Sequence, residues 1–148
     1  MRVWCLTSGP ENYAKTAELG WKVQGIKSRR RKTAEQISPG DKVIYYITGH
    51  VAFGAIAEVT SEYFEDHELI WTSKPGEDYP WRFEIRPEVV IEDPELWVPA
   101  EELYDDLAFV KKWPEQNWKL AFQGNIRQWP ESDYRVVRSA LEEAAGAG

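Results

Sequence analysis

The sequence is poor in residues that build covalent or metal-bound scaffolds. Its 148 residues include one cysteine, Cys5, and two histidines, His50 and His67. A lone cysteine forms no internal disulfide, and these three soft ligands do not make up the ligand set of a structural zinc site. No base in the sequence stands out as a partner that would activate Cys5 as a nucleophile. We therefore expect Cys5 to be a small core residue of the first strand, and we expect no metal and no cofactor.

Long apolar runs are also missing. No stretch approaches the 18 apolar residues that mark a membrane-spanning helix. The first residues, "MRVWCLTSGPENY", contain neither the apolar region nor the small-residue cleavage site of a secretory signal. We therefore expect a cytoplasmic protein with no membrane partner. The length predicts a single domain over residues 1–148, large enough to bury a core without staples.

The standard catalytic motifs are absent as well. The sequence has no G-x-S-x-G, no Walker loop, no G-x-G-x-x-G and no H-E-x-x-H. Acid pairs such as 101–102 and 105–106 lie in a solvated acidic stretch, and adjacent residues face different ways, so they do not form a general acid and base pair. We assign no catalytic residue and do not expect an enzyme.

The charge is distributed unevenly along the chain, whose formal net charge is −7. Residues 1–50 carry nine Lys and Arg against four Asp and Glu, a net charge of +5, whereas residues 51–148 carry nine against twenty-one, a net charge of −12. An acidic protein does not coat nucleic acid non-specifically. The basic first third still permits one local cationic surface.

This basic character is concentrated in the stretch "GWKVQGIKSRRRKT", residues 20–33. Five of the six residues from 27 to 32 are cations, namely Lys27, Arg29, Arg30, Arg31 and Lys32. Such a run is often a solvated loop. Phosphate binding would explain why arginine dominates, because its planar guanidinium grips phosphate oxygens with two hydrogen bonds.

Aromatic residues are abundant, with eight Trp, seven Tyr and five Phe. Most must belong to the core, because a domain of this size cannot expose so many rings without aggregating. Three of them stand beside turns: Trp21 after Gly20, Tyr79 before Pro80, and Trp129 before Pro130. Rings placed at strand ends around a barrel mouth would sandwich a flat heterocycle, and stacking on a base is worth roughly 1–3 kcal/mol. Core packing is the alternative for each ring.

The hydrophobic pattern predicts a strand-rich chain. Strands are expected at 2–7, 42–48, 52–64 and 81–91, with extended pieces at 21–25 and 67–71 and a brief strand within 123–129. Helices are expected at 10–19, 33–36, 99–107, 114–122 and 130–146. Segments 42–48 and 52–64 form a hairpin around Gly49 and His50. The result is an α+β fold with five to seven strands, helices at the ends of the sheet and a possible barrel closure.

Several motifs in this order resemble the EVE domain of the PUA-like superfamily. They are "SGPENY" after the first strand, "GW" about ten residues later, "ISPGDKVIYYITG" leading into "FGAIAEVTSEYF", "YPWRFEIRP", and "FQGNIRQWPESDY". The resemblance extends over residues 2–138. It implies a PUA-like mixed β pseudo-barrel with flanking short helices. It also implies kinship with the YTH readers of N6-methyladenine and the SRA readers of 5-methylcytosine.

The resemblance also implies where a modified base would lie. The two rings of the YTH pocket correspond to Trp21 and Tyr79, and the polar segment that contacts the base edge corresponds to Ser8 and Asn12. Tyr79 replaces a tryptophan of the YTH pattern. The "FQGNIR" motif is similar to a signature loop of the family, which implies that Gln123 and Arg127 lie near the pocket or a phosphate. Trp129, beside a turn, is the third candidate ring.

We therefore expect a nucleic-acid-binding module that holds a flipped, modified base, in DNA rather than RNA, with the cations of residues 27–32 and Arg127 on the phosphates. An RNA-binding module for tRNA or rRNA is the first alternative. An enzyme that acts on a flipped base, with Glu84 or Asp78 as the base, is a second, and a module that binds a basic protein partner is a third. Because no nuclease or helicase domain is attached, any effector is expected to be a separate protein.

Overall fold

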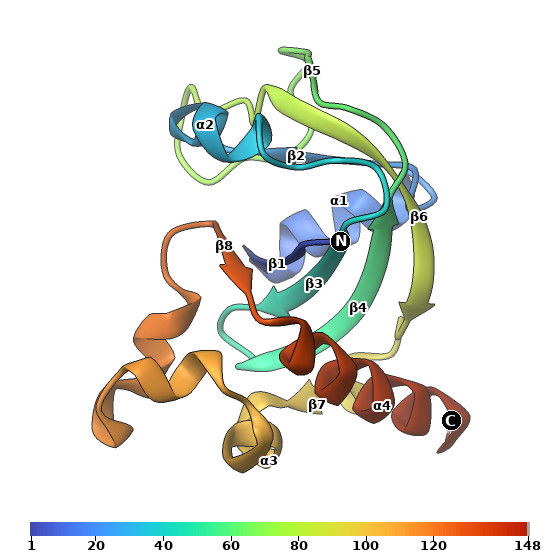
Figure 1. The fold of residues 1–148 in the computed structure, drawn as a ribbon. Coiled ribbons are helices and arrows are strands. Elements are labelled where there is room, and N and C mark those ends of the chain that lie inside the picture. The colour runs from blue at the N-terminus through green and yellow to red at the C-terminus, as the bar shows by residue number, and fades with distance from the viewer. Residues whose placement is uncertain (148) are drawn as a thin grey trace.

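A mixed sheet of eight strands curls into a half-barrel in the computed structural model, which describes residues 1–147 (Figure 1). The strand order is β2-β6-β4-β3-β1-β8, and two short strands extend it, β5 along β6 and β7 along β4. The strands are β1 (Val3–Ser8), β2 (Val23–Ile26), β3 (Lys42–Ile47), β4 (Ala52–Val59), β5 (Phe64–Glu65), β6 (Trp81–Val90), β7 (Val98–Pro99) and β8 (Ile126–Trp129).

Strand β1 lies inside the sheet and explains the apolar run at the start of the sequence. It pairs in parallel with β3 and antiparallel with β8, and most of its side chains are buried. A strand covered on both faces reads as a continuous apolar run instead of an alternating one. Register shifts at Tyr45/Tyr46 and at Ile56/Ala57 interrupt the ladders of β3, β4 and β6. Such bulges increase the local twist and help the sheet to curve.

Short helices flank the sheet. The α-helices are α1 (Pro10–Glu18), α2 (Arg31–Ala34), α3 (Ala100–Leu103) and α4 (Glu131–Ala147), and 3₁₀ helices cover Ser28–Arg30, Pro94–Leu96, Tyr104–Asp106, Phe109–Lys112 and Glu115–Phe122. Helix α1 begins with proline at its first position, where the missing N–H costs nothing, and ends at Glu18, two residues before Gly20, whose φ is +73°. None of the described helices combines the length and the apolar character needed to cross a membrane.

A buried polar network connects several elements of the fold. The side-chain oxygen of Gln24 on β2 accepts hydrogen bonds from the Thr16 hydroxyl at 2.8 Å and from the Tyr45 hydroxyl at 3.0 Å. The indole N–H of Trp71 donates to Thr16 Oγ1 at 2.9 Å. The network therefore joins α1, β2 and β3 to the loop before β6, and satisfied buried networks of this kind fix one arrangement.

The architecture confirms the expected α+β fold with a partly closed mixed sheet and short helices. Cys5 is a buried core residue, and burial raises the pKa of its thiol. The strand expected over 52–64 ends at Val59, because Thr60 N–H turns to the carbonyl of Glu84 and Ser61 Oγ accepts from Glu84 N–H. The extended piece expected at 67–71 is a loop instead, and the short strand β5 precedes it.

Two expected helices also differ. The turn expected at 33–36 lies earlier, because the cations of residues 28–34 themselves form a 3₁₀ turn followed by α2. Segment 114–122 is a 3₁₀ helix with a kink at Asn117, where φ is −123°.

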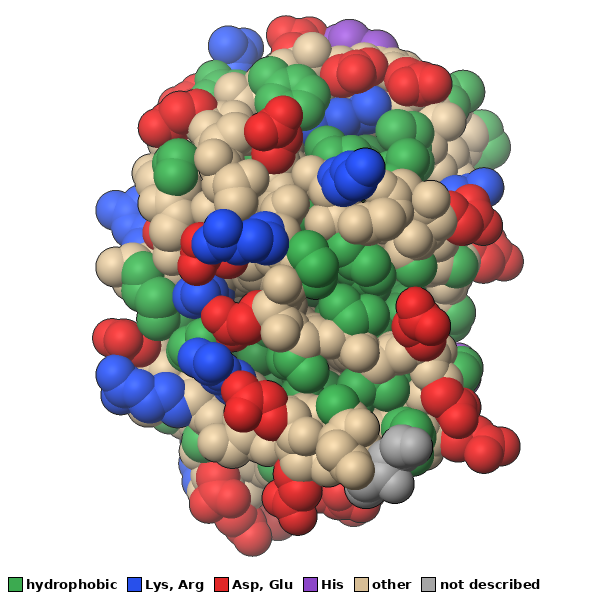
Figure 2. Space-filling model, turned by 90° about the vertical axis from the view of Figure 1, so that its right-hand side faces the viewer, with side chains coloured by type: hydrophobic (Ala, Val, Ile, Leu, Met, Phe, Trp, Pro, Cys, Tyr) green, Lys and Arg blue, Asp and Glu red, His purple; other side chains and the backbone are tan. Residues whose placement is uncertain are grey.

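Seen from the side of β6, the surface shows acidic and basic side chains interspersed with hydrophobic ones (Figure 2).

Candidate functional site

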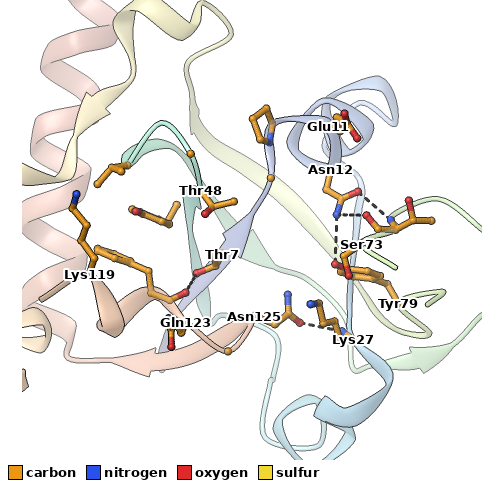
Figure 3. Close-up of a pocket in the computed structure, with 18 of the residues that line it drawn as sticks. Thr7, Glu11, Asn12, Lys27, Thr48, Ser73, Tyr79, Lys119, Gln123 and Asn125 are labelled. Carbon is orange, nitrogen blue, oxygen red and sulfur yellow. Dashed lines mark hydrogen bonds between the residues drawn. The ribbon is translucent and has the colours of Figure 1, made fainter. Parts of the chain in front are cut away.

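A cleft of about 740 Å³ opens beyond the ends of β1 and β3, where five segments meet (Figure 3). This volume lies within the range of small-molecule sites. The segments are the start of α1, the residues after β2, the β3–β4 turn, the loop before β6 and the chain before β8. They contribute Gly9, Pro10, Glu11, Asn12, Lys27, Arg29, Thr48, Gly49, Val51, Thr72, Ser73, Tyr79, Lys119, Gln123, Gly124 and Asn125, together with Thr7, Tyr46 and Phe122 from below.

Tyr79 and Asn12 form one wall of the cleft. Tyr79 is 5% exposed and adopts a left-handed backbone conformation, with φ +48°. The side-chain amide of Asn12 donates to Thr72 O at 3.1 Å and lies 3.5 Å from the Tyr79 hydroxyl, while Asn12 Oδ1 accepts from Thr72 N–H at 3.1 Å. Burial raises the pKa of Tyr79, so the hydroxyl stays protonated at neutral pH. Asn12 thus fastens the loop to helix α1.

Arg82 supports this wall from behind. Its side chain is almost fully buried, and its guanidinium donates to the backbone carbonyls of Tyr79 and Asp78, each at 3.1 Å. It also pairs with Asp66 at 3.3 Å and lies over the Trp71 ring at 5.2 Å. A buried arginine with carbonyl and carboxylate partners has its charge compensated. Arg82 therefore fixes the backbone that presents Tyr79.

Asn125 joins the opposite segments of the cleft. Its side-chain oxygen accepts a hydrogen bond from Lys27 N–H at 3.0 Å, and its own carbonyl accepts from Thr7 N–H at 2.7 Å. Its φ of +71° is left-handed, a conformation that asparagine tolerates better than most residues. Lys27 lines the cleft, and its ammonium lies 4.0 Å from Glu77.

Two stacked rings lie below the cleft. Tyr46 and Phe122 are nearly parallel, with an interplanar angle of 5° and ring centroids 3.7 Å apart. Both contribute to the cleft lining although each is only 4% exposed. Burial raises the pKa of Tyr46 to about 12. These rings give the cleft a rigid base.

Of the residues expected in a base pocket, Asn12, Tyr79 and Gln123 line the cleft. Ser8 lies next to it at the end of β1, but its side chain is buried and its hydroxyl donates to Gly9 O at 3.2 Å. Its hydroxyl therefore already has a backbone acceptor, and Ser8 itself does not belong to the lining.

Trp21 does not share the cleft with Tyr79, so the expected sandwich of these two rings is not formed. The Trp21 ring is 6% exposed and packs edge-on against Tyr13 and Tyr45, with centroids 5.2 Å and 5.0 Å away. Its backbone has φ +57° directly after the left-handed Gly20, and the ring lies in the core. It borders a separate apolar hollow beside Trp97.

Trp129 is likewise a core residue. Its side chain is 3% exposed, stacks on Phe109 with a centroid distance of 5.2 Å, and touches Phe122 at 5.6 Å. For Trp129 and for Trp21, core packing, which the sequence left open as the alternative to a place in the base pocket, is therefore what the structure shows. Both rings stabilise the fold around the cleft without lining it.

The expected phosphate-binding cations divide into two groups. Lys27 and Arg29 line the cleft, and Arg30 and Arg127 meet beside Gly124 at its edge. A Cβ on Gly124 would lie 2.7 Å from Arg30 Nη2 and 3.6 Å from Arg127 Nε. Burial lowers the pKa of Arg30, and the charges of Arg29 and Arg127 lower it further. These arginines are therefore close enough to repel each other.

Arg31 and Lys32 do not reach the cleft. Both are exposed on α2, where Arg31 pairs with Glu35 at 3.7 Å and lies 5.1 Å from the centre of the Trp81 ring. Neither belongs to the lining, because the helical turn directs the end of the cationic run away from it. The structure therefore does not bring Arg31 and Lys32 together with Lys27 and Arg29 at the cleft.

Sequence reasoning missed Lys119, Thr48, Ser73 and Asn125 as lining residues. Asn125 follows a glycine in "FQGNIR", and a Gly-Asn pair is a signal for left-handed backbone and a tight turn. Thr48 and Ser73 lie in loops, Lys119 lies in the 3₁₀ helix Glu115–Phe122, and none of the three carries a pattern of its own. Glu84 and Asp78, considered as catalytic bases, lie outside the lining, and Asp78 pairs with His67 at 2.5 Å.

Comparisons with known proteins identify the family of the chain. The family model described as the EVE domain matches residues 2–137. A UPF0310 protein of Pyrococcus abyssi (strain GE5 / Orsay) is 30% identical over 151 residues, which cover 95% of this chain and all of that protein.

Two solved structures carry the same fold. The YTH domain of Zygosaccharomyces rouxii MRB1 in complex with N6-methyladenosine RNA has a TM-score of 0.64 at 18% identity, and the match covers 97% of this chain and 86% of that one. Human THYN1 in complex with DNA containing 5-methylcytosine has a TM-score of 0.61 at 15% identity, covering 96% and 98%. At these identities the likeness concerns the fold, which is of the PUA-like type.

Proposed function

The chain belongs to the EVE domain family, and from that premise we propose that it binds a modified base of nucleic acid in the cleft. The observation that carries this proposal is the composition of the lining. Amide side chains, the Tyr79 ring and cations converge there from segments far apart in the sequence. Amides donate to and accept from a base edge, an aromatic ring stacks on its face, and Lys or Arg binds its phosphate.

The structural neighbours support this proposal in general terms. One was solved with N6-methyladenosine RNA and the other with DNA that contains 5-methylcytosine, and both match nearly the whole of this chain. A base enters such a cleft only after it leaves the stack, at a cost of a few kcal/mol for a paired base. The proposed ligand is therefore an extruded or unpaired nucleotide.

We propose DNA as the partner, as the family resemblance implies, and matched RNA is the alternative that the experiment must test. Selectivity for the modification has to come from the shape of the cleft and from the cost of extruding the base. The reason is that burying one added methyl group contributes only about 0.8 kcal/mol, or roughly a fourfold preference.

We propose binding without chemistry, with any effector a separate protein. The lining contains one carboxylate, Glu11, and neither histidine nor cysteine. General acid and base catalysis needs two groups with suitably tuned pKa values near the reacting atoms. A time course of oligonucleotide composition with the protein, with and without Mg²⁺, tests this directly, and any product would contradict it.

Fluorescence anisotropy tests the binding proposal. The probes are short DNA and RNA oligonucleotides with one N6-methyladenine, one 5-methylcytosine or the plain base, each as a single strand and as a duplex. The proteins are the wild type, Tyr79→Ala in the cleft, and Tyr63→Ala, a half-buried tyrosine outside the lining, as the matched control.

We expect the wild type to prefer one modified probe, and Tyr79→Ala to lose about 1–3 kcal/mol of binding, a factor of roughly 5 to 150. Tyr63→Ala should bind as the wild type does. Equal affinity of the wild type for every probe, or full affinity in Tyr79→Ala, would show that the cleft does not read a base.

A further inference from the structure

A group of cations beside the cleft has no acidic partner. Several cations elsewhere are paired, such as Lys42 with Glu58 at 2.8 Å and Arg138 with Glu142 at 2.6 Å. Arg29, Arg30, Arg127 and Lys112 form no ion pair with any residue from 1 to 147. In an acidic protein, cations left free of carboxylates mark a surface suited to an anionic partner.

These cations form a continuous row that begins at the cleft. Arg29 lines the cleft, Arg30 and Arg127 meet over Gly124, and Arg127 continues onto Trp113, with its guanidinium carbon 5.3 Å from the ring centre. Trp113 adjoins Phe109 at a centroid distance of 5.3 Å, and the Lys112 ammonium lies 4.8 Å from the Phe109 ring centre. We call Arg29, Arg30, Arg127, Trp113 and Lys112 the cationic strip.

The contacts within the cationic strip orient its charges without neutralising them. Aromatic rings attract a cation through their quadrupole but leave its net charge intact. The Arg127 side chain is further fixed because its Nε donates to Gln123 O at 2.6 Å. Arg30 Nε is buried and has no hydrogen-bond partner among the described residues. A phosphate beside these guanidinium groups would relieve the repulsion among the three arginines.

The opposite side of the cleft is different. The segments Gly9–Asn12, Thr48–Val51 and Thr72–Ser73 contribute one charged residue to the lining, Glu11, and it is acidic. Lys119 is a cation of the lining that lies next to Val51 on this side. A duplex has two phosphate backbones, one on each side of an extruded base. Here the strip side presents four cations in a row, whereas the other side presents a cation together with a carboxylate that repels phosphate.

We propose that the cationic strip binds the backbone of a single strand, so that the ligand of this protein is single-stranded nucleic acid longer than the nucleotide in the cleft. This inference rests on the proposed function and names the form of its ligand. Positively charged surfaces with interleaved aromatic rings track one strand by holding its phosphates and stacking its bases. The nucleotides next to the modified base lie along Arg30, Arg127 and Trp113.

The experiment measures affinity against strand length, strandedness and salt. The probes carry one N6-methyladenine, one 5-methylcytosine or the plain base at the centre of single strands of one, three, six and nine nucleotides. The nine-nucleotide strand is also paired with its complement. The test protein is Arg127→Gln with Lys112→Gln. The matched control is Lys15→Gln with Arg86→Gln, which removes the same charge from two exposed residues outside the strip.

We expect the wild type to gain affinity from one to six nucleotides and to bind the single strand at least tenfold more tightly than the duplex. The test variant should lose most of the length gain, and its salt dependence should weaken by about 1.4 in slope, because each single-strand phosphate contact contributes about 0.7. The control should keep the gain and the slope. Arg127→Lys, which retains the charge, should recover part of the affinity, and circular dichroism should show every variant folded.

Two outcomes would overturn the proposal: a length gain unchanged in the test variant, or a duplex bound as tightly as the single strand. They are distinct from failure of the proposed function. If the wild type does not distinguish modified from plain bases yet keeps its dependence on length and on Arg127, the strip stands and the base reader fails. If the wild type distinguishes the bases but its affinity does not depend on strand length, the base reader stands and the role of the strip fails.

Discussion

The side-chain oxygen of Asn125 accepts a hydrogen bond from the backbone N–H of Lys27 at 3.0 Å, across 98 positions of the sequence. This bond ties the segment after β2 to the segment before β8, and both segments line the cleft. The Asn125 side chain therefore has a structural role and also contributes its polar surface to the proposed binding site.

Two substitutions separate these roles. Asn125→Ala removes the acceptor and places alanine at φ +71°, and we expect a loss of about 2 kcal/mol in the free energy of unfolding. Asn125→Asp keeps an acceptor and tolerates the same backbone, so its stability should stay within about 1 kcal/mol of the wild type. Its added negative charge should weaken nucleic-acid binding. Urea unfolding and anisotropy measure the two effects, and a stable Asn125→Ala would refute the structural role.

Gly25→Ala tests the backbone behind Tyr79. A Cβ at position 25 would lie 2.6 Å from Tyr79 O and 2.8 Å from the Trp71 ring, so the loop before β6 would have to move. Overpacking of this kind costs about 1–3 kcal/mol. We expect lower stability together with weaker binding. Gly146→Ala is the control, because nothing lies within 4 Å of its added methyl and alanine favours a helix. An unchanged melting temperature in Gly25→Ala would show that the contact is relieved without cost.

Trp21 should matter for stability and not for binding. Trp21→Ala leaves a cavity between Tyr13 and Tyr45 and should lower the free energy of unfolding by about 3–5 kcal/mol. Trp21→Phe retains most of the packing and should bind every oligonucleotide as the wild type does. Thermal unfolding and anisotropy on the same samples check this. If the folded Trp21→Phe variant lost its discrimination between bases, Trp21 would have to contribute to binding.

His67 should make stability depend on pH. Its two ring nitrogens contact Glu65 at 2.6 Å and Asp78 at 2.5 Å, and these hydrogen bonds raise the pKa of His67 above its usual value. Its contribution is therefore fully present below the unfolded pKa of about 6.5 and is lost as pH rises through the folded value. The difference in unfolding free energy between the wild type and His67→Gln should shrink from pH 5.5 to pH 8.5. A constant difference would contradict the coupling.

The sequence allowed the strands and the family to be predicted, because both depend on patterns that neighbouring residues share. The run 2–7 and the hairpin segments 42–48 and 52–64 are apolar and β-prone over most of their length. They form β1, β3 and β4, although β4 ends at Val59. The polar wall of the cleft was partly predictable too. The family resemblance implied Asn12 for this wall, and Asn12 lines the cleft.

The rings could not be placed in this way. Trp21 and Tyr79 both stand beside turns and both have positive φ, +57° and +48°. One lies in the core and the other lines the cleft, because the direction of each side chain depends on tertiary contacts made by distant segments: Tyr13 and Tyr45 for Trp21, and Asn12 with Arg82 for Tyr79. Those contacts cannot be predicted from composition and spacing.

The pairing of β1 with β8 can form only late in synthesis, because its two strands lie near opposite ends of the sequence. Val3 leaves the ribosome early but pairs with Trp129, and the cleft residues Gln123 to Asn125 directly precede that partner strand. Pairings between distant segments form late, since the intervening chain must first be present. A nascent chain that lacks β8 has neither a completed sheet nor this wall of the cleft. A chain that ends before β8 therefore lacks part of the proposed binding site.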